Sequence, residues 1–270
     1  MQCAAWADRQ ATVVIWTIAL STLLGLTAWK VRSATPLAAV AGAALTASLM
    51  FSTASVPYTP LRTGLMPILA LLVLTSLSTR LGRRRKEHLG TAEQRAGRQS
   101  AQVAANLGAG VVLSLSMVQI WQMDQPWLHL FGLRPSAVFI IGMAALCEAA
   151  ADTVSSELGQ VLNSRPRMIT NFRVAEPGTD GAISLPGTLT GCLAASVVAL
   201  VAVSALRGDT LMFAVSWLGG IFGLLFDSLL GATFERRGWL NNDAVNFLST
   251  CNAAAFAMVL LALRPSIGLR

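Results

Sequence analysis

Charged residues are scarce in this chain. Only 12% of its 270 residues are Asp, Glu, Lys or Arg, whereas 54% are hydrophobic. Soluble domains typically carry about 25% charged residues, so too little polar surface remains here to cover a soluble helical core. We therefore predict an all-α, polytopic membrane protein.

Histidine and cysteine are also sparse. The sequence holds two histidines and four cysteines, and their spacing fits neither a disulfide framework nor a zinc site. A histidine relay is therefore not expected, which leaves carboxylates, Arg, Lys and amides to carry any chemistry.

Long apolar segments dominate what is present. About 20 apolar residues cross a hydrocarbon core about 30 Å thick as a helix. We expect eight such spans, within a range of six to ten, in one integral membrane domain comprising residues 1–270. The predicted spans are 12–29, 35–56, 64–79, 101–121, 137–158, 187–206, 211–233 and 245–263.

The basic residues are distributed unevenly between the two sides of such a bundle. Most of the 20 Lys and Arg residues fall on one side, including Arg83, Arg84, Arg85 and Lys86. This asymmetry places that side in the cytoplasm, or its topological equivalent, with both termini opposite. The cluster is interpreted as this orientation signal, with contact to anionic lipids as a further role.

Carboxylates and amides collect at span ends on the same basic side. Asp152 and Glu157 end the fifth span, Asp227 lies near the end of the seventh, and Asp243 begins the eighth. Burying a carboxylate at a helix centre costs about 2.5–3.5 kcal/mol, so we expect protonation, a divalent cation or an Arg to offset it. The alternative is that the acids pair with Arg only to orient helices.

Two sequence patterns surround these acids. In the loop 163–191, Arg165, Arg167 and Arg173 precede a stretch rich in Gly, Ser and Thr, which is typical of an anion-binding loop and also of an ordinary one. In the seventh span, Gly219, Gly223 and Gly231 are separated by multiples of four residues and so lie near one face of the helix. Such spacing favours close helix packing within one chain or between two.

Five ordered motifs resemble one integral membrane family. They are QVAAN (102–106), ADTVSSELG (151–159), RPRMITNFRVAEPGTDGAISLPGT (165–188), LFDSLLGAT (225–233) and NDAVN (242–246). The chain resembles, over residues 80–265, the family of the transmembrane protein 19 group and the phytyl-phosphate kinases of plants and cyanobacteria in tocopherol biosynthesis. A weaker likeness is to CTP-dependent polyprenol kinases and cytidylyltransferases.

The resemblance implies a kinase that converts an isoprenoid (phytyl or prenyl) monophosphate to the diphosphate, with Mg²⁺ and with CTP or ATP as donor. The expected partners are the isoprenoid phosphate and membrane lipids, and no nucleic acid. The protein is expected to be an integral, multi-pass membrane protein. The sequence does not identify the organelle, and a plastid envelope and an endomembrane are the candidates. A transporter of an anionic amphiphile or a cation, a CTP-dependent cytidylyltransferase and a non-catalytic membrane protein remain as alternatives.

Site residues follow from the motifs and from the needs of phosphoryl transfer. The expected metal-binding and catalytic residues are Asp152, Glu157, Asp227 and Asp243. The expected phosphate-binding residues are Arg165, Arg167, Arg173, Thr179, Ser184 and Thr188. The expected substrate-positioning residues are Asn106, Ser156 and Asn246.

Overall fold

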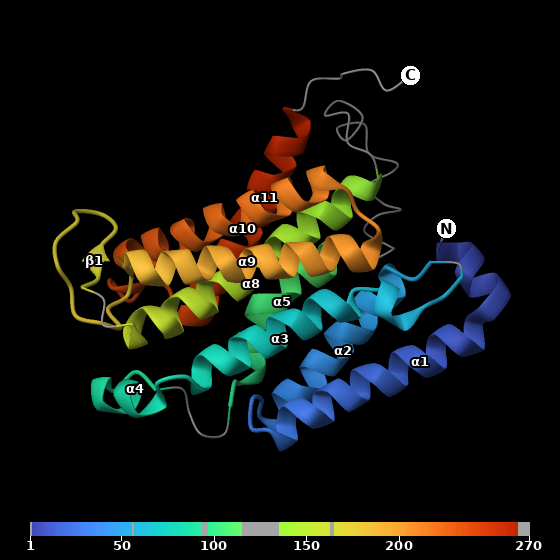
Figure 1. Ribbon diagram of the computed structural model, residues 1–270, viewed down its shortest axis with the longest axis horizontal. Coiled ribbons are helices and arrows are strands. Elements are labelled where there is room, and N and C mark those ends of the chain that lie inside the picture. Colours follow the sequence, from blue (N-terminus) through green and yellow to red (C-terminus); the bar gives the residue numbers. More distant parts are fainter. Residues whose placement is uncertain (1, 56, 93–96, 115–134, 163–164, 264–270) are drawn as a thin grey trace.

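The computed structural model describes residues 2–55, 57–92, 97–114, 135–162 and 165–263, which form a bundle of helices (Figure 1). The helices are α1 (Gln2–Lys30), α2 (Pro36–Ser52), α3 (Leu65–Arg80), α4 (Arg83–Leu89), α5 (Ser100–Ser114), α8 (Pro135–Val161), α9 (Leu185–Leu206), α10 (Thr210–Leu230) and α11 (Asn242–Ala262). The shorter elements are a 3-10 turn (Pro60–Arg62), the strands β1 (Arg167–Met168) and β2 (Ala182–Ile183), and a π-helical segment η2 (Gly231–Glu235). The predicted all-α, polytopic class is confirmed.

The number of membrane spans is lower than the eight predicted. Among the described residues, five helices are long and apolar enough to cross a membrane, or six if α3 and α4 form one bent span. A helix does lie in each of the eight predicted segments. However, α2 has 17 residues and α5 has 15, which at about 1.5 Å per residue falls short of a core about 30 Å thick. Residues 115–121 of the predicted fourth span lie outside the described residues.

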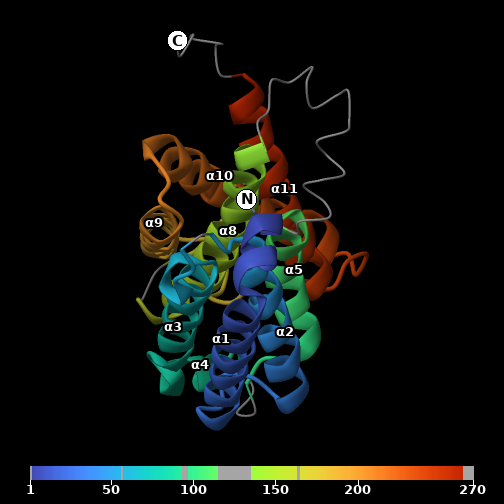
Figure 2. The same cartoon turned by 90° about the vertical axis from the view of Figure 1, so that its right-hand side faces the viewer.

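Helix α8 forms the centre of the bundle. Figure 2 shows it enclosed by α3, α5, α9, α10 and α11. In its most apolar window 83% of the residues are buried, against 28–39% in the other four candidate spans. Small residues such as Ala144, Ala150 and Ala151 let the neighbouring helices approach it closely, so carboxylates carried by α8 face protein.

The helix starts are set by local capping. Ser184, Asp209 and Asn241 each accept a hydrogen bond from the backbone N–H three residues later, at 3.2, 2.9 and 2.9 Å. These bonds satisfy orphan donors at the first turns of α9, α10 and α11.

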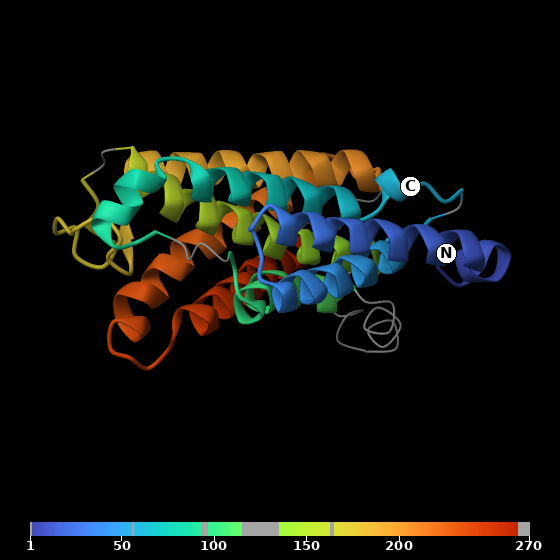
Figure 3. The ribbon, with the colours of Figure 1, turned by 90° about the horizontal axis from the view of Figure 1, so that it is seen from below.

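The basic loops lie at one end of the bundle. Figure 3 shows α4, the β1–β2 loop and the α10–α11 connection at the same end. Helix α4 turns away from α3 by 64° at Gly82, which has a φ of 63°. The β1–β2 loop folds as a small antiparallel pair in which Arg167 lies opposite Ile183. The candidate site lies beneath this end.

Candidate functional site

Helices α8 and α10 meet along a seam of glycines. A Cβ atom added to Gly220 would lie 2.7 Å from the Cβ of Cys147, and one added to Gly223 would lie 2.4 Å from the Cγ of Glu148. Neither distance is sterically allowed, so both glycines are required for this packing. The predicted role of the glycine repeat in close helix packing therefore holds for Gly223, which makes room for a carboxylate.

Replacing Gly223 with alanine is expected to destabilise the protein. The added methyl group would press on Glu148, and it would also lie 2.8 Å from the Cβ of Ala253. Overpacking of this kind costs about 1–3 kcal/mol, measurable as a lower Tm in detergent. Gly108→Ala in α5 is the matched control, because nothing lies within 4 Å of the added atom there. Equal Tm values for the two variants would contradict the assigned packing.

Five carboxylates gather where α8, α10 and the β1–β2 loop meet. Glu148 is fully buried and accepts a hydrogen bond of 2.6 Å from the Ser249 hydroxyl of α11. The carboxylates of Glu148, Asp152 and Asp227 lie close enough to repel one another. Asp227 is also repelled by Glu235 and Asp180. The members of this acidic cluster are Glu148, Asp152, Asp180, Asp227 and Glu235.

One oxygen of the acidic cluster lacks a partner. Oδ2 of Asp227 is buried, and it is the one buried side-chain oxygen or nitrogen of the described residues that forms no hydrogen bond. An unsatisfied buried acceptor costs about 1–3 kcal/mol, and more when it is charged. A cation or a donor group from a bound substrate would remove this cost.

The β1–β2 loop brings Asp180 to the cluster through close backbone packing. Gly181 has a φ of 75°, and a Cβ atom there would lie 2.2 Å from the backbone N of Ala232 in η2. Only glycine fits between the two backbones. The sequence interpretation left Asp180, Glu148 and Glu235 out of the site, although the Asp-Gly pair in AEPGTDG marks the required turn.

The Glu157 carboxylate is paired with a lysine and is therefore not counted in the acidic cluster. Its Oε2 lies 2.6 Å from the Nζ of Lys86, and its Oε1 accepts a hydrogen bond of 2.9 Å from Thr79. Lys86 is fully buried and also donates to the carbonyls of Ser78 and Thr79 at 2.9 and 2.8 Å. Glu157 therefore joins α8 to α3 and α4, and we remove it from the proposed metal ligands.

Residues predicted on α11, α5 and the end of α8 have different surroundings. Asp243 lies in the first turn of α11, where a carboxylate favours the helix N-terminus. The Asn246 carbonyl accepts a hydrogen bond of 2.9 Å from Ser249, which links it to the acidic cluster. Asn106 is buried in α5, whereas Ser156 is exposed and donates to the Thr153 carbonyl of its own helix.

The predicted phosphate-binding residues lie on or beside the β1–β2 loop. Arg165, Arg167 and Arg173 are exposed, and Arg167 donates to the Phe172 carbonyl at 2.9 Å. Thr179 and Thr188 are partly buried and Ser184 caps α9. The three arginines thus form an exposed rim on the loop that carries Asp180 of the acidic cluster.

The acidic cluster does not form a complete protein cage for a metal. Within the part of the chain that the structure describes, no three His, Cys, Asp or Glu side chains are close enough to hold an ion together. Mg²⁺, however, is usually bound by one or two carboxylates together with waters and substrate phosphates. Asp152 and the unpartnered oxygen of Asp227 fit that mode.

A positive group adjoins the acids. Arg98, which precedes α5, interacts electrostatically with Asp152. The sequence interpretation did not include Arg98, because the contact joins residues far apart in the chain. The site therefore combines carboxylates that suit a cation with a guanidinium that suits an anion.

Comparison with known proteins places this chain in a family. A family profile described as "Integral membrane protein DUF92" matches residues 19–254. The chain is 46% identical to the Uncharacterized membrane protein MJ0933 of Methanocaldococcus jannaschii over 123 residues, which is 46% of this chain and 50% of the relative. It is 31% identical to Protein VTE6, chloroplastic, of Arabidopsis thaliana over 202 residues, which is 73% of this chain and 58% of the relative.

A third relative is covered more fully. The Uncharacterized membrane protein sll0875 of Synechocystis is 29% identical over 198 residues, which is 72% of each chain. The matched regions span about half to three fifths of the first two relatives. No solved structure matches the chain. Because the family profile covers most of its length, this multi-pass chain belongs to the DUF92 family of integral membrane proteins.

Proposed function

We propose that the protein is a Mg²⁺-dependent kinase that phosphorylates an isoprenoid monophosphate to the diphosphate, with CTP or ATP as donor. The observation that carries the proposal is the buried, unpartnered oxygen of Asp227, whose carboxylate interacts electrostatically with Asp152, which in turn interacts with Arg98. Phosphoryl transfer requires this pairing of a cation site with an anion site. The motif resemblance to the phytyl-phosphate kinases supports the same chemistry.

The reaction needs little covalent chemistry from the protein. An oxygen of the acceptor phosphate attacks the γ-phosphorus of the nucleotide, the bond between that phosphorus and the β–γ bridging oxygen breaks, and a nucleoside diphosphate leaves. No general base is needed, because the acceptor phosphate is already an anionic nucleophile. Mg²⁺, when bound, neutralises and orients the phosphate oxygens.

The residues of this chain hold and orient the substrates. Asp152 and Asp227 would hold the metal, and Arg98 would offset charge on a phosphate oxygen. Arg165, Arg167 and Arg173 on the loop rim would contact the phosphates of the nucleotide, which approaches from the aqueous side. Thr179 and Thr188 can donate hydrogen bonds, whereas Asn246 and Asp243 would help to position the donor from the start of α11.

A transfer assay tests this proposal. Purified protein in detergent or liposomes is given phytyl or geranylgeranyl phosphate, γ-labelled CTP or ATP, and magnesium. Label is expected in the lipid diphosphate, and Asp152→Asn is expected to lower the rate by about 10²–10³-fold, the scale for losing one preorganised electrostatic group. Glu176→Gln is the control, because Glu176 is an exposed acid of the same loop outside the acidic cluster.

Other labels separate the competing functions. Label from the α-phosphate in a lipid product, with release of pyrophosphate, would indicate a cytidylyltransferase instead. Metal-dependent binding of the lipid phosphate without any transfer from either nucleotide would indicate a transporter. Full activity of Asp152→Asn would remove Asp152 from the site.

A further inference from the structure

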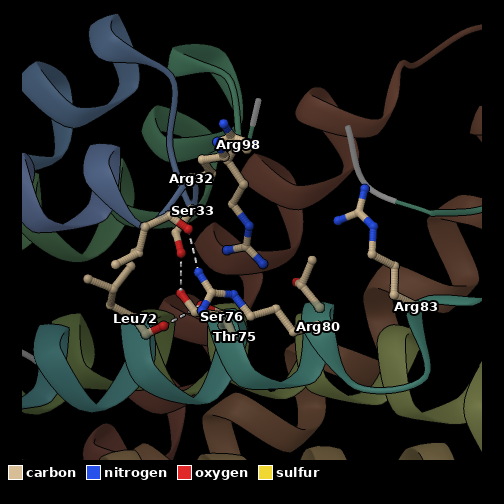
Figure 4. Close-up of a pocket in the computed structure, with 11 residues that line it drawn as sticks. Arg32, Ser33, Leu72, Thr75, Ser76, Arg80, Arg83 and Arg98 are labelled. Atoms are coloured by element: carbon tan, nitrogen blue, oxygen red, sulfur yellow. Dashed lines mark hydrogen bonds between the residues drawn. The ribbon is translucent and has the colours of Figure 1, made fainter. Parts of the chain in front are cut away.

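A basic pocket lies at the same end of the bundle. It is a cavity of about 460 Å³ between the α1–α2 connection, α3, α4 and the segment that leads into α5 (Figure 4). None of its lining residues is acidic, and four of them are arginines: Arg32, Arg80, Arg83 and Arg98. The hydroxyl groups of Ser33, Thr75, Ser76 and Thr79 complete its polar lining.

Specific contacts build this pocket. Arg98 donates its backbone N–H to the Ser33 carbonyl at 3.1 Å, and its own carbonyl accepts from the Thr35 N–H at 2.9 Å. Gly97 permits this approach, since its φ is 85° and a Cβ atom would lie 2.6 Å from the backbone N of Ala34. Ser76 on α3 donates to the Ser33 hydroxyl at 3.0 Å. The four arginines thus lie on four separate segments around one space.

The charges in the pocket favour an anion. Figure 4 shows the side chains of Arg80 and Arg98 extending into the same space, although both are positive. Neither Arg32 nor Arg80 forms an ion pair with a described residue, whereas Arg83 lies 3.1 Å from Glu87 of α4. Guanidinium groups match phosphate oxygens in geometry and charge, so a bound phosphate would relieve the repulsion between them.

An apolar cavity continues from the basic pocket into the bundle. It has a volume of about 70 Å³ and shares Ser33, Leu72, Thr75 and Arg98 with the pocket. The rest of its lining is mostly apolar and comes from α1, α2, α3 and α5, including Leu24, Ala38, Ile68 and Val103. Asn106, which the sequence predicted to position substrate, also lines it. A charged pocket that leads into an apolar cavity suits a molecule with a charged head and an apolar chain.

We propose that the basic pocket binds the phosphate group of an amphiphile, and that the first carbons of the apolar chain enter the adjoining cavity. Identifying this amphiphile as the acceptor rests on the proposed function, because Arg98 connects the pocket to Asp152. The acceptor phosphate would then lie between four arginines at the basic end of the bundle, while the nucleotide contacts the loop rim.

Binding without nucleotide or metal tests the site separately from catalysis. The probe is labelled geranylgeranyl monophosphate, titrated into the full chain in neutral detergent, with inorganic pyrophosphate as the soluble comparison. Arg32→Gln/Arg80→Gln is expected to weaken lipid phosphate binding by about 10–100-fold, in line with the loss of two charge-assisted hydrogen bonds. The matched control is Lys30→Gln/Arg84→Gln, which removes the same charge from exposed residues at the same end but outside the pocket.

A third variant tests the apolar cavity. A Cβ atom at Gly42 would meet only a Val103 methyl group, at 3.7 Å, so Gly42→Leu is expected to fold and to fill part of the cavity. It should weaken binding of the lipid phosphate at least tenfold and leave pyrophosphate binding unchanged. A thermal-unfolding measurement on every variant confirms that each is folded.

Two results would overturn the inference. The first is equal lipid phosphate affinity for the pocket variant and its charge-matched control. The second is loss of pyrophosphate binding in the pocket variant together with unchanged lipid binding in Gly42→Leu, which would make the pocket a site for a free phosphate. If the pocket binds the lipid phosphate but no phosphoryl transfer occurs, the pocket assignment is kept and the proposed kinase function is rejected. If transfer occurs but the pocket variant binds normally, the kinase function is kept and the pocket assignment is rejected.

Discussion

Asp227→Asn is expected to lower the rate of phosphoryl transfer by about two to three orders of magnitude while leaving the protein folded and at least as stable as the wild type. The substitution keeps the size of the side chain but removes the charge of a buried oxygen that has no hydrogen-bond partner. Loss of one such group should lower kcat by about 10²–10³-fold. It should also remove repulsion between Asp227 and the carboxylates of Asp152, Glu235 and Asp180, which favours the folded state.

Two measurements check this combination. The first is the transfer rate at saturating Mg²⁺, and the second is the Tm in detergent with and without Mg²⁺. Wild-type Tm should rise with Mg²⁺, because a ligand that binds only the folded state stabilises it, and the rise should disappear in Asp227→Asn. In the absence of Mg²⁺ the Tm of the variant should equal or exceed that of the wild type.

Asp209→Asn is the matched control for this prediction. Asp209 is the N-cap of the same helix at its opposite end, and Asn is an equally good cap. This variant should keep both the activity and the Mg²⁺-dependent rise in Tm. An Asp227→Asn protein with normal turnover, or with the full Mg²⁺-dependent rise, would contradict the role of Asp227 as a metal ligand.

Local spacing was sufficient to predict part of the site. The glycines around Asp227 predicted close helix packing at this acid, and the structure has Asp227 interacting with Glu148 and Asp152 across the α8–α10 seam. Such patterns work because the period of a helix fixes which residues share a face. The same logic located the helices, although α2 and α5 are shorter than the predicted spans.

Long-range contacts were not predictable in the same way. Lys86 and Glu157 are 71 residues apart, and nothing in RRRKE distinguishes the buried lysine from its exposed neighbours. Arg98 and Asp152 are likewise far apart in the sequence, and their interaction depends on how the segment with Gly97 packs on the α1–α2 connection. The basic pocket gathers arginines from α1–α2, α3, α4 and the start of α5, so its existence depends on the tertiary arrangement.

Lys86→Met is expected to cause the largest loss of stability. Removing one partner of a buried ion pair typically costs about 3–5 kcal/mol, because it leaves the other charge buried and uncompensated. Here the substitution would leave the Glu157 carboxylate with only the Thr79 hydroxyl as a partner, at a position where its side chain is 12% exposed. The loss is measured as the free energy of unfolding by denaturant titration in mixed micelles.

The double variant Lys86→Met/Glu157→Leu distinguishes charge from packing. Replacing both partners of a buried pair with apolar residues is often nearly neutral, so most of the lost stability should return. Arg84→Gln is the control for a lost positive charge on α4, because Arg84 is exposed and its substitution should change stability by less than about 0.5 kcal/mol. If the single and double variants were equally unstable, the ion pair would not be what holds α4 to α8.

The same double variant tests the removal of Glu157 from the metal site. If Glu157 only joins α8 to α3 and α4, a folded double variant should keep its transfer rate and its Mg²⁺-dependent rise in Tm. If Glu157 binds the metal, both should fall as they do in Asp227→Asn, even though the protein is folded. The pair of measurements therefore separates an acid that holds the scaffold from the acids that we propose hold Mg²⁺.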